Sequence, residues 1–125
     1  AGMPVLGELK LRVKSDIHQV RDLLLQYRSL DFDGCVATND EMAVGVLKYA
    51  AIKGIRVPED VEVVGYNNSV LSKCCEPELT SVDNRVTQIC YDTIDRLCAV
   101  LNNDEEIEKN LIIPCSLVKR CTTDF

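Results

Sequence analysis

Polar side chains follow two short apolar segments of the chain, where they could bind a small ligand. Asn39 and Asp40 come directly after residues 34–38, and Asn67 follows residues 61–65. An Asn amide both donates and accepts hydrogen bonds and an Asp carboxylate accepts them, so these side chains suit the hydroxyl groups of a polar metabolite. The spacing of Asn39 and Asp40 favours helix capping over ligand contact, and the position of Asn67 suits a turn. Capping and ligand contact can coexist.

The sequence carries no recognisable catalytic set, and we expect the protein not to be an enzyme. A nucleophile elbow of the G-x-S-x-G type, a P-loop and a dinucleotide fingerprint are all missing from it. His18 is the only histidine, which leaves almost no material for a Ser/His or Cys/His arrangement. The acid pairs Asp31/Asp33 and Asp40/Glu41 stand in a turn and at a helix start, where acids are favoured without catalytic use.

The seven cysteines are an odd number and include no C-x-x-C pair. With one histidine and thiolates of the wrong spacing, we expect neither a metal site nor a cofactor. A reduced, cytoplasmic setting fits best, with the cysteines serving mainly as small buried hydrophobes. They are Cys35, Cys74, Cys75, Cys90, Cys98, Cys115 and Cys121.

Composition excludes several classes of function for this chain taken alone. It has 125 residues, of which 46% are hydrophobic, and this is enough for one packed domain. Its 20 acids and 14 bases give a net charge of −6, and no basic stripe could follow a phosphate backbone. We therefore expect no DNA binding by this chain itself. The longest apolar run is far shorter than the roughly 20 residues that span a bilayer, so no membrane contact is expected.

Hydrophobic periodicity predicts alternating helices and strands in the first half of the chain. A helix should begin at Asp16 and end near Ser29, and residues 34–38 should form a short strand buried on both faces. Residues 38–41 have the spacing of a capping box, which begins a second helix that should end near Gly54.

The rest of the chain predicts an open α/β fold, with a mainly parallel sheet flanked by helices. We expect a buried strand at 61–65, an irregular loop at 67–77 and a short strand at 79–82. A third helix should begin at Asp83 or Asn84 and end at the acidic stretch 102–108, and residues 111–118 should form a final extended segment. Because Pro114 lacks a backbone N–H, that last strand should lie at an edge or a crossing point. Ligands bind such sheets at the carboxyl ends of the strands.

Several blocks of the sequence resemble the LacI/GalR family of bacterial transcription regulators. Their order and spacing match the family over residues 34–121 without an evident insertion, which is far more specific than any single block. The blocks are Ala37 to Gly45, Gly54 to Val61, Val63 to Asn68, Pro77 to Val82 and Ile113 to Arg120.

This resemblance implies a periplasmic-binding-protein-like effector domain of type I, of which the chain would be an incomplete, C-terminal fragment with a Rossmann-like subdomain. Family members hold a sugar, nucleoside or related metabolite between two subdomains. As homodimers they pass its binding to helix-turn-helix headpieces on operator DNA, and this chain would lack the headpiece. Residues 1–83 would form most of the C-terminal subdomain, and residues 84–125 a crossing helix and strand that belong largely to the N-terminal one.

The resemblance also assigns roles to individual residues. Asn39 and Asn67 would face the effector, with Asp40 nearby. The family usually has an Asp where Asn67 stands, and an amide keeps the hydrogen bonding but loses the charge. The exposed face of the second helix and the polar loop after the second strand would form dimer contacts. The residues concerned are Val44, Lys48, Cys74 and Cys75.

Two other functions stay open on the sequence. A periplasmic sugar receptor would share the fold, and a signal peptide upstream would favour it over the regulator. A small α/β enzyme or phospho-acceptor domain would use Asp40, but it should also show acids at several strand ends and a Lys, which the sequence does not. The third helix and last strand would lack their family neighbours here, so we expect that helix to fold onto its own sheet or the chain to self-associate.

Overall fold

A parallel β-α-β unit lies at the centre of the structure. The computed structural model describes residues 11–27, 32–102 and 110–125. Strands β1 (Gly34–Val36) and β2 (Glu62–Tyr66) pair in parallel, and helix α2 (Asp40–Lys53) connects them. The predicted unit is therefore confirmed, and the residues that follow both strands lie at the same edge of the sheet.

Four strands form one sheet in the order β1-β2-β3-β4. Strand β3 (Thr80–Asp83) is parallel to β2, whereas β4 (Ser116–Val118) is antiparallel to β3. Among the described residues β4 has one neighbour and lies at the sheet edge, in agreement with the prediction made from Pro114. The expected α/β class with a mainly parallel sheet is confirmed.

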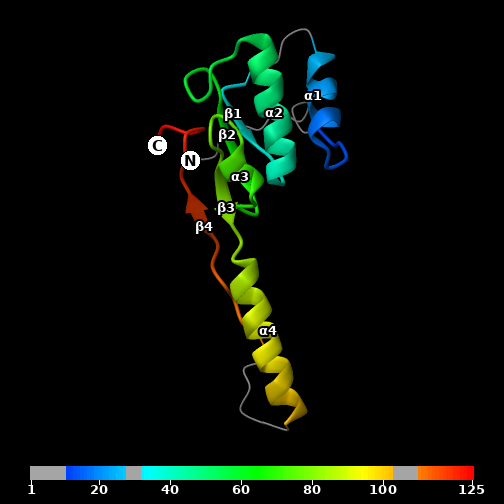
Figure 1. Cartoon of the computed structure of the whole chain (residues 1–125), viewed down its shortest axis with the longest axis vertical. Helices are drawn as coiled ribbons and strands as arrows, with labels where there is room; N and C mark the ends of the chain where they lie inside the picture. The colour runs from blue at the N-terminus through cyan, green and yellow to red at the C-terminus, as the bar shows by residue number, and fades with distance from the viewer. Residues whose placement is uncertain (1–10, 28–31, 103–109) are drawn as a thin grey trace.

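Helix α2 lies between the sheet and α1 (Ile17–Leu25), as Figure 1 shows. Aliphatic side chains from these three layers form the core, among them Leu24, Leu47, Val63 and Leu79. Gly45 lets the two helices approach closely, because a Cβ there would lie 2.7 Å from Val20 Cβ and 2.8 Å from the backbone oxygen of Ile17. The core thus fixes α2 between the sheet and α1.

The structure corrects the prediction of how β1 is buried. Gly34 is exposed and Val36 is 82% exposed, whereas a strand buried on both faces was expected. The reason is that β1 is the other edge of the described sheet, with β2 as its neighbour there. A continuous apolar run predicts a strand but does not reveal which neighbours cover it.

Two element boundaries also differ from the sequence pattern. The N-cap of α2 is Asn39, whose Oδ1 accepts from the Met42 backbone N at 2.8 Å, rather than Thr38 as the capping box predicts. A one-turn helix, α3 (Leu71–Cys74), interrupts the segment predicted to be an irregular loop. The predicted end of the first helix near Ser29 lies outside the described residues, and α1 itself ends at Leu25.

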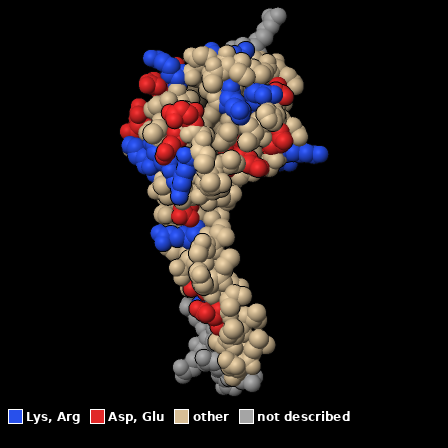
Figure 2. Space-filling view, in the orientation of Figure 1, with Lys and Arg blue, Asp and Glu red and all other residues tan. Residues whose placement is uncertain are grey.

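Helix α4 (Val86–Leu101) extends from the body as an arm, and the chain returns beside it toward β4 (Figure 1). We call residues 86–101 and 110–115 the arm. No residue of α4 is buried, and its visible face carries few charges compared with the body (Figure 2). The third helix is confirmed with Asn102 as C-cap, but it does not fold onto the sheet; the acidic residues 103–108 lie outside the described part.

None of the helices in the described ranges is long and apolar enough to cross a lipid bilayer.

Candidate functional site

A strained two-residue turn follows β2. Asn67 and Asn68 both have positive φ angles, 96° and 48°, a backbone conformation that Asn tolerates better than most residues. The Asn67 backbone N donates to the Val82 carbonyl at 2.9 Å, and the Asn68 backbone N donates to Ser81 Oγ at 3.0 Å. Two bonds to the neighbouring strand β3 therefore hold the turn at the carboxyl end of the sheet.

This turn lines a hollow of about 480 Å³, where the carboxyl ends of β2 and β3 meet the start of α4. Asn84 Nδ2 donates to Asn67 Oδ1 at 2.9 Å, so these two lining side chains are hydrogen-bonded to each other. Arg85, the N-cap of α4, also has a positive φ of 56°. The lining residues are Asn67, Asn68, Asp83, Asn84, Arg85, Val86, Thr87, Gln88 and Tyr91.

The chemistry of this hollow is that of a polar binding site. Amides and the hydroxyls of Thr87 and Tyr91 can exchange hydrogen bonds with ligand hydroxyls, and the ring of Tyr91, a residue that is 69% exposed, can pack against an apolar ligand face. The Asp83 carboxylate already accepts from the Arg85 backbone N at 2.8 Å. The buried Oδ1 of Asn84 has no hydrogen-bond partner among the described residues. The lining contains no pairing of a nucleophile with a histidine base.

Asp40 supports the site from beneath instead of lining it. Its side chain is 2% exposed, its Oδ1 accepts from Ser81 Oγ at 2.6 Å, and its Oδ2 accepts from the Ser69 backbone N at 2.6 Å. The carboxylate sits in the first turn of α2, where the helix dipole favours a negative charge. Gly65 of β2 leaves room for it, because a Cβ at Gly65 would collide with Asp40 Oδ1. Both carboxylate oxygens accept hydrogen bonds from the protein, so the structure does not support the predicted direct contact between Asp40 and an effector.

Asn39, the second residue predicted to face an effector, is a helix cap with both ends of its amide in use. Its Oδ1 accepts from the Met42 backbone N, and its Nδ2 donates to Ser15 Oγ at 2.5 Å. It is not among the residues that line the hollow with Asn67. The structure therefore places Asn39 and Asn67 at the same edge of the sheet without joining them in one hollow.

The residues predicted to form dimer contacts differ in exposure. Val44 was expected on an exposed face of α2 but is only 8% exposed, so that expectation is wrong. Lys48 and Cys74 are exposed and Cys75 is half-buried. The role of these residues in dimer contact stays a prediction.

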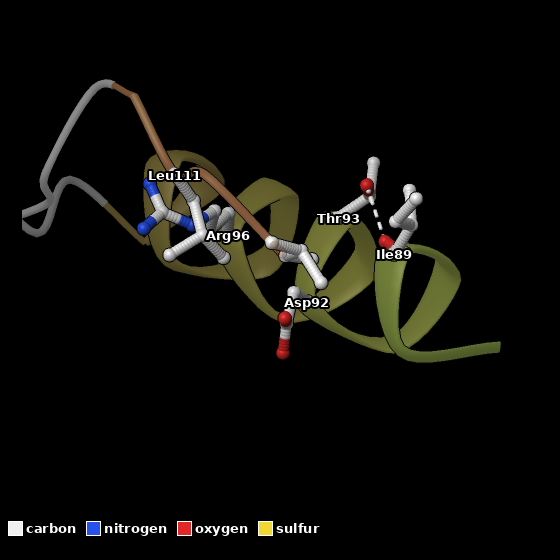
Figure 3. A pocket seen from close by; sticks show the side chains of 6 residues that line it. Ile89, Asp92, Thr93, Arg96 and Leu111 are labelled. Carbon is white, nitrogen blue, oxygen red and sulfur yellow. Dashed lines mark hydrogen bonds between the residues drawn. The ribbon is translucent and has the colours of Figure 1, made fainter. Parts of the chain in front are cut away.

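A second hollow, of about 230 Å³, lies within the arm between α4 and the returning segment. Figure 3 shows Asp92 and Arg96 of the helix beside Leu111 of the returning chain. The Thr93 hydroxyl in its wall donates to the Ile89 carbonyl at 2.6 Å and is thereby occupied. With about half the volume of the first hollow and no amide cluster, it is the weaker candidate.

Two titratable side chains of the sheet, Cys35 and Tyr66, have pKa values raised above their ordinary ones. Burial raises the pKa of the Cys35 thiol in β1 to about 11, which keeps it neutral and unreactive at neutral pH. The hydrogen bond between the Tyr66 hydroxyl and Cys115 Sγ, 3.9 Å apart, raises the pKa of Tyr66. Within the described residues no group of three or more His, Cys, Asp or Glu side chains could hold a metal ion.

Sequence reasoning did not single out the residues after β3, although they contribute most of the hollow. Asp83 ends β3, which is parallel to β2, and Asn84 and Arg85 follow it, so the rule that pointed to Asn67 applies equally to them. These three polar residues directly follow the strand predicted at 79–82, so the sequence pattern could have indicated them. Gln88 and Tyr91 had no such signal, because only the direction of α4 brings them to the site.

The profile of one protein family, described as a periplasmic binding protein-like domain, matches residues 6–123. The chain belongs to this family. Within it, the resemblance to LacI-type transcription regulators is confirmed. An HTH-type transcriptional regulator from Lachnoclostridium phytofermentans is 36% identical over 98% of this chain, and the lactose operon repressor of Escherichia coli is 35% identical over 70% of it.

Solved structures of LacI-family regulators share the architecture of this chain over the part that it covers. A sugar-binding LacI-family regulator from Escherichia coli, complexed with phosphate, superposes with a TM-score of 0.82 at 27% identity, over 96% of this chain and 44% of that one. A LacI-family regulator from Arthrobacter in complex with lactose gives 0.76 at 26% identity, over 87% of this chain and 42% of that one. The chain spans 37% and 24% of the length of the two curated relatives. These relatives are transcription regulators and not enzymes.

Proposed function

We propose that this chain is an effector-sensing part of a LacI-type transcription regulator, and that the hollow beside Asn67 forms one wall of the effector site. The observation that carries the proposal is the cluster of amides at the carboxyl ends of β2 and β3, in a chain whose relatives are LacI-type regulators. Open α/β sheets bind ligands at this edge. In our proposal Asn67 contacts the effector directly, whereas Asn39 and Asp40 shape the wall around it.

The effector that we propose is a sugar or a nucleoside-like metabolite. The wall offers amides and hydroxyls in place of an apolar pocket, which suits a ligand rich in hydroxyl groups. Two similar solved regulators are described as complexes with cellobiose and with lactose, which supports the carbohydrate class. An amide at Asn67 favours a ligand that exchanges hydrogen bonds without a charge partner.

We propose a two-part organisation for the chain. Residues 1–83 form most of one subdomain, and residues 84–115 cross to a second subdomain, which completes the effector cleft. The expected assignment of residues 116–125 to the second subdomain is not kept, because β4 pairs with β3 and the buried Thr122 donates to the Val63 carbonyl. The exposed apolar side chains of the arm support this division, because a second subdomain would cover them. Effector binding then shifts the relative orientation of the subdomains, and this shift is the signal.

DNA recognition, in this proposal, belongs to a helix-turn-helix headpiece that is not part of this sequence. The net charge of −6 supports that assignment, because operator binding needs a basic surface. The regulator acts in the cytoplasm as a homodimer, with Lys48, Cys74 and Cys75 near the contact between subunits. A periplasmic receptor or an enzyme fits less well, because the relatives reported above are transcription regulators.

A thermal-shift panel on the full-length protein tests the proposal. The compounds are glucose, lactose, cellobiose, ribose and adenosine, and a ligand that binds only the folded state raises the melting temperature by mass action. Asn67→Gly removes the amide but accepts the positive φ, so it should abolish the shift without unfolding the protein. Asn110→Ala, at an exposed amide outside the hollow, is the matched control and should keep it. Absence of any shift with the unmodified protein would contradict effector sensing of this class.

A further inference from the structure

A single arginine, Arg120, connects the end of the chain to the turn that lines the hollow. Its side chain is 9% exposed although it follows β4 at the sheet edge. Nη1 donates to the Leu79 carbonyl at 2.7 Å, and Nη2 donates to Asn68 Oδ1 at 2.6 Å. The nearest carboxylate is that of Glu78, 3.8 Å from Nε and itself 53% exposed. The closest hydrogen-bond partners of the buried guanidinium are therefore a neutral carbonyl and a neutral amide, and not a carboxylate.

The Asn68 amide depends mainly on this arginine. Its other two side-chain contacts are long: Ser72 Oγ lies 3.4 Å from Oδ1, and Asp83 Oδ2 lies 3.4 Å from Nδ2. A hydrogen bond from a charged donor at 2.6 Å is considerably stronger than either. Since Asn67 and Asn68 adopt positive φ angles, which cost free energy for residues other than glycine, the turn persists only if its surroundings hold it.

Burying an arginine is costly, so its presence at this position points to a role beyond packing. We propose that Arg120 is a positioning residue for ligand binding: by holding the Asn68 amide, it fixes the turn in which Asn67 faces the hollow. Arg120 itself does not line the hollow. The inference rests on the proposed function of that hollow, but its structural part, control of the turn, can be measured without any ligand.

The ligand-free test is hydrogen exchange of the backbone amides of Asn67 and Asn68 in the full-length protein, read by NMR. Arg120→Met keeps much of the length and the apolar contacts of the side chain but removes its donors. It should speed exchange of the Asn67 and Asn68 backbone N–H groups by about tenfold or more. Arg120→Lys keeps the positive charge and a single donor nitrogen, and it should keep part of the protection. The matched control is Thr122→Val, two residues along, because Thr122 is fully buried and its hydroxyl bonds the Thr80 backbone N and the Val63 carbonyl rather than the turn.

Ligand affinity supplies the second readout. For whichever panel sugar or nucleoside stabilises the unmodified protein, Arg120→Met should weaken binding about tenfold, and Thr122→Val should leave affinity unchanged even where it lowers the melting temperature as much. If Thr122→Val reproduces both effects, Arg120 is merely structural and the proposal is overturned. Unchanged exchange in Arg120→Met overturns it as well. If no panel compound binds the unmodified protein, the proposed function fails while the exchange data still decide the role of Arg120.

Discussion

At the scale of single residues, Asp40 is a tightly held polar group of the body. It is buried, and its two oxygens join three separate elements: its own helix α2, the turn after β2 through the Ser69 backbone, and β3 through Ser81. Removing one member of such a group leaves its partners buried without a hydrogen bond, which costs more than the bond itself contributes.

We predict that Asp40→Ala lowers the free energy of unfolding by about 3 kcal/mol, because Ser81 Oγ and the Ser69 backbone N would both lose their acceptor. Urea denaturation measures this. Asp16→Ala, at the N-cap of α1, removes the hydrogen bond that its side chain accepts from the Gln19 backbone N and should cost only about 1 kcal/mol. Equal losses in the two variants would show that Asp40 does no more than cap a helix.

Cys35 gives a prediction about pH. Its folded-state pKa of about 11 lies above the value near 8.5 that an unfolded cysteine has. The stabilisation that comes from keeping this thiol neutral is therefore fully present below about pH 8.5 and is lost as the pH rises toward 11. Urea midpoints at pH 7 and pH 10 should differ less in Cys35→Val than in the unmodified chain.

The exposure of the cysteines gives a second prediction. At pH 8, iodoacetamide should alkylate the exposed Cys74 and Cys115 well before Cys35.

Residue types predicted part of the site and missed the rest for a physical reason. Capping by Asn39 and a turn at Asn67 follow from local backbone chemistry, which a sequence displays directly. The burial of Asp40 depends on Gly65 and Ser81, which lie 25 and 41 residues away along the chain and are brought near it by sheet register. The expected exposure of Val44 was wrong because no local pattern shows which face of α2 the body covers.

At the scale of elements, the contact between α1 and α2 depends on the missing side chain of Gly45. Replacing a helix glycine by alanine gains about 1 kcal/mol from propensity alone. Here the added Cβ would meet both a side chain and a backbone oxygen of α1 at under 3 Å, and relieving that overlap costs about 1–3 kcal/mol. The steric cost should exceed the gain.

We therefore predict that Gly45→Ala destabilises the chain, by about 1 kcal/mol net, and that α1 exchanges its amide hydrogens faster than the sheet does. Gly34→Ala is the matched control. A Cβ at Gly34 meets nothing within 4 Å and the residue needs no positive φ, so its effect should stay within about 0.5 kcal/mol. A stabilised Gly45→Ala variant would mean that the two helices can move apart freely.

Most elements could be predicted from the sequence because their patterns are long. The helices after Asn39 and Arg85 have 14 and 16 residues and clear boundaries, including Gly54 in the left-handed conformation at the end of α2. The four residues of α3 are too few for a periodic signal. The position of β1 at an edge is a property of the whole sheet, so a run of three to five residues could not reveal it.

At the scale of the whole molecule, the arm exposes a continuous apolar stripe. Val86, Ile94, Leu97 and Leu101 share one face of α4 and are each at least half exposed. Apolar stripes of this kind on a helix are usually covered by another surface.

We predict that the 125-residue chain, prepared alone, self-associates through this face, with a sedimentation coefficient that rises with concentration. Leu97→Lys should reduce the association at least about tenfold, because it places a charge in the stripe. Val70→Lys makes a comparable change at an exposed apolar residue of the body, 71% exposed, and should have no effect. A strictly monomeric chain at all concentrations, or equal effects of both substitutions, would contradict this.

The arm follows Arg85 and ends at Cys115, whose Sγ lies 3.9 Å from the Tyr66 hydroxyl of the body, and its length makes it a lever. A 16-residue helix is about 24 Å long, so a rotation of about 10° at its base displaces its far end by about 4 Å. The base of the lever is lined by the same residues that form the hollow. A ligand that rotates α4 by shifting Arg85 would therefore produce its largest displacement at the tip of the arm.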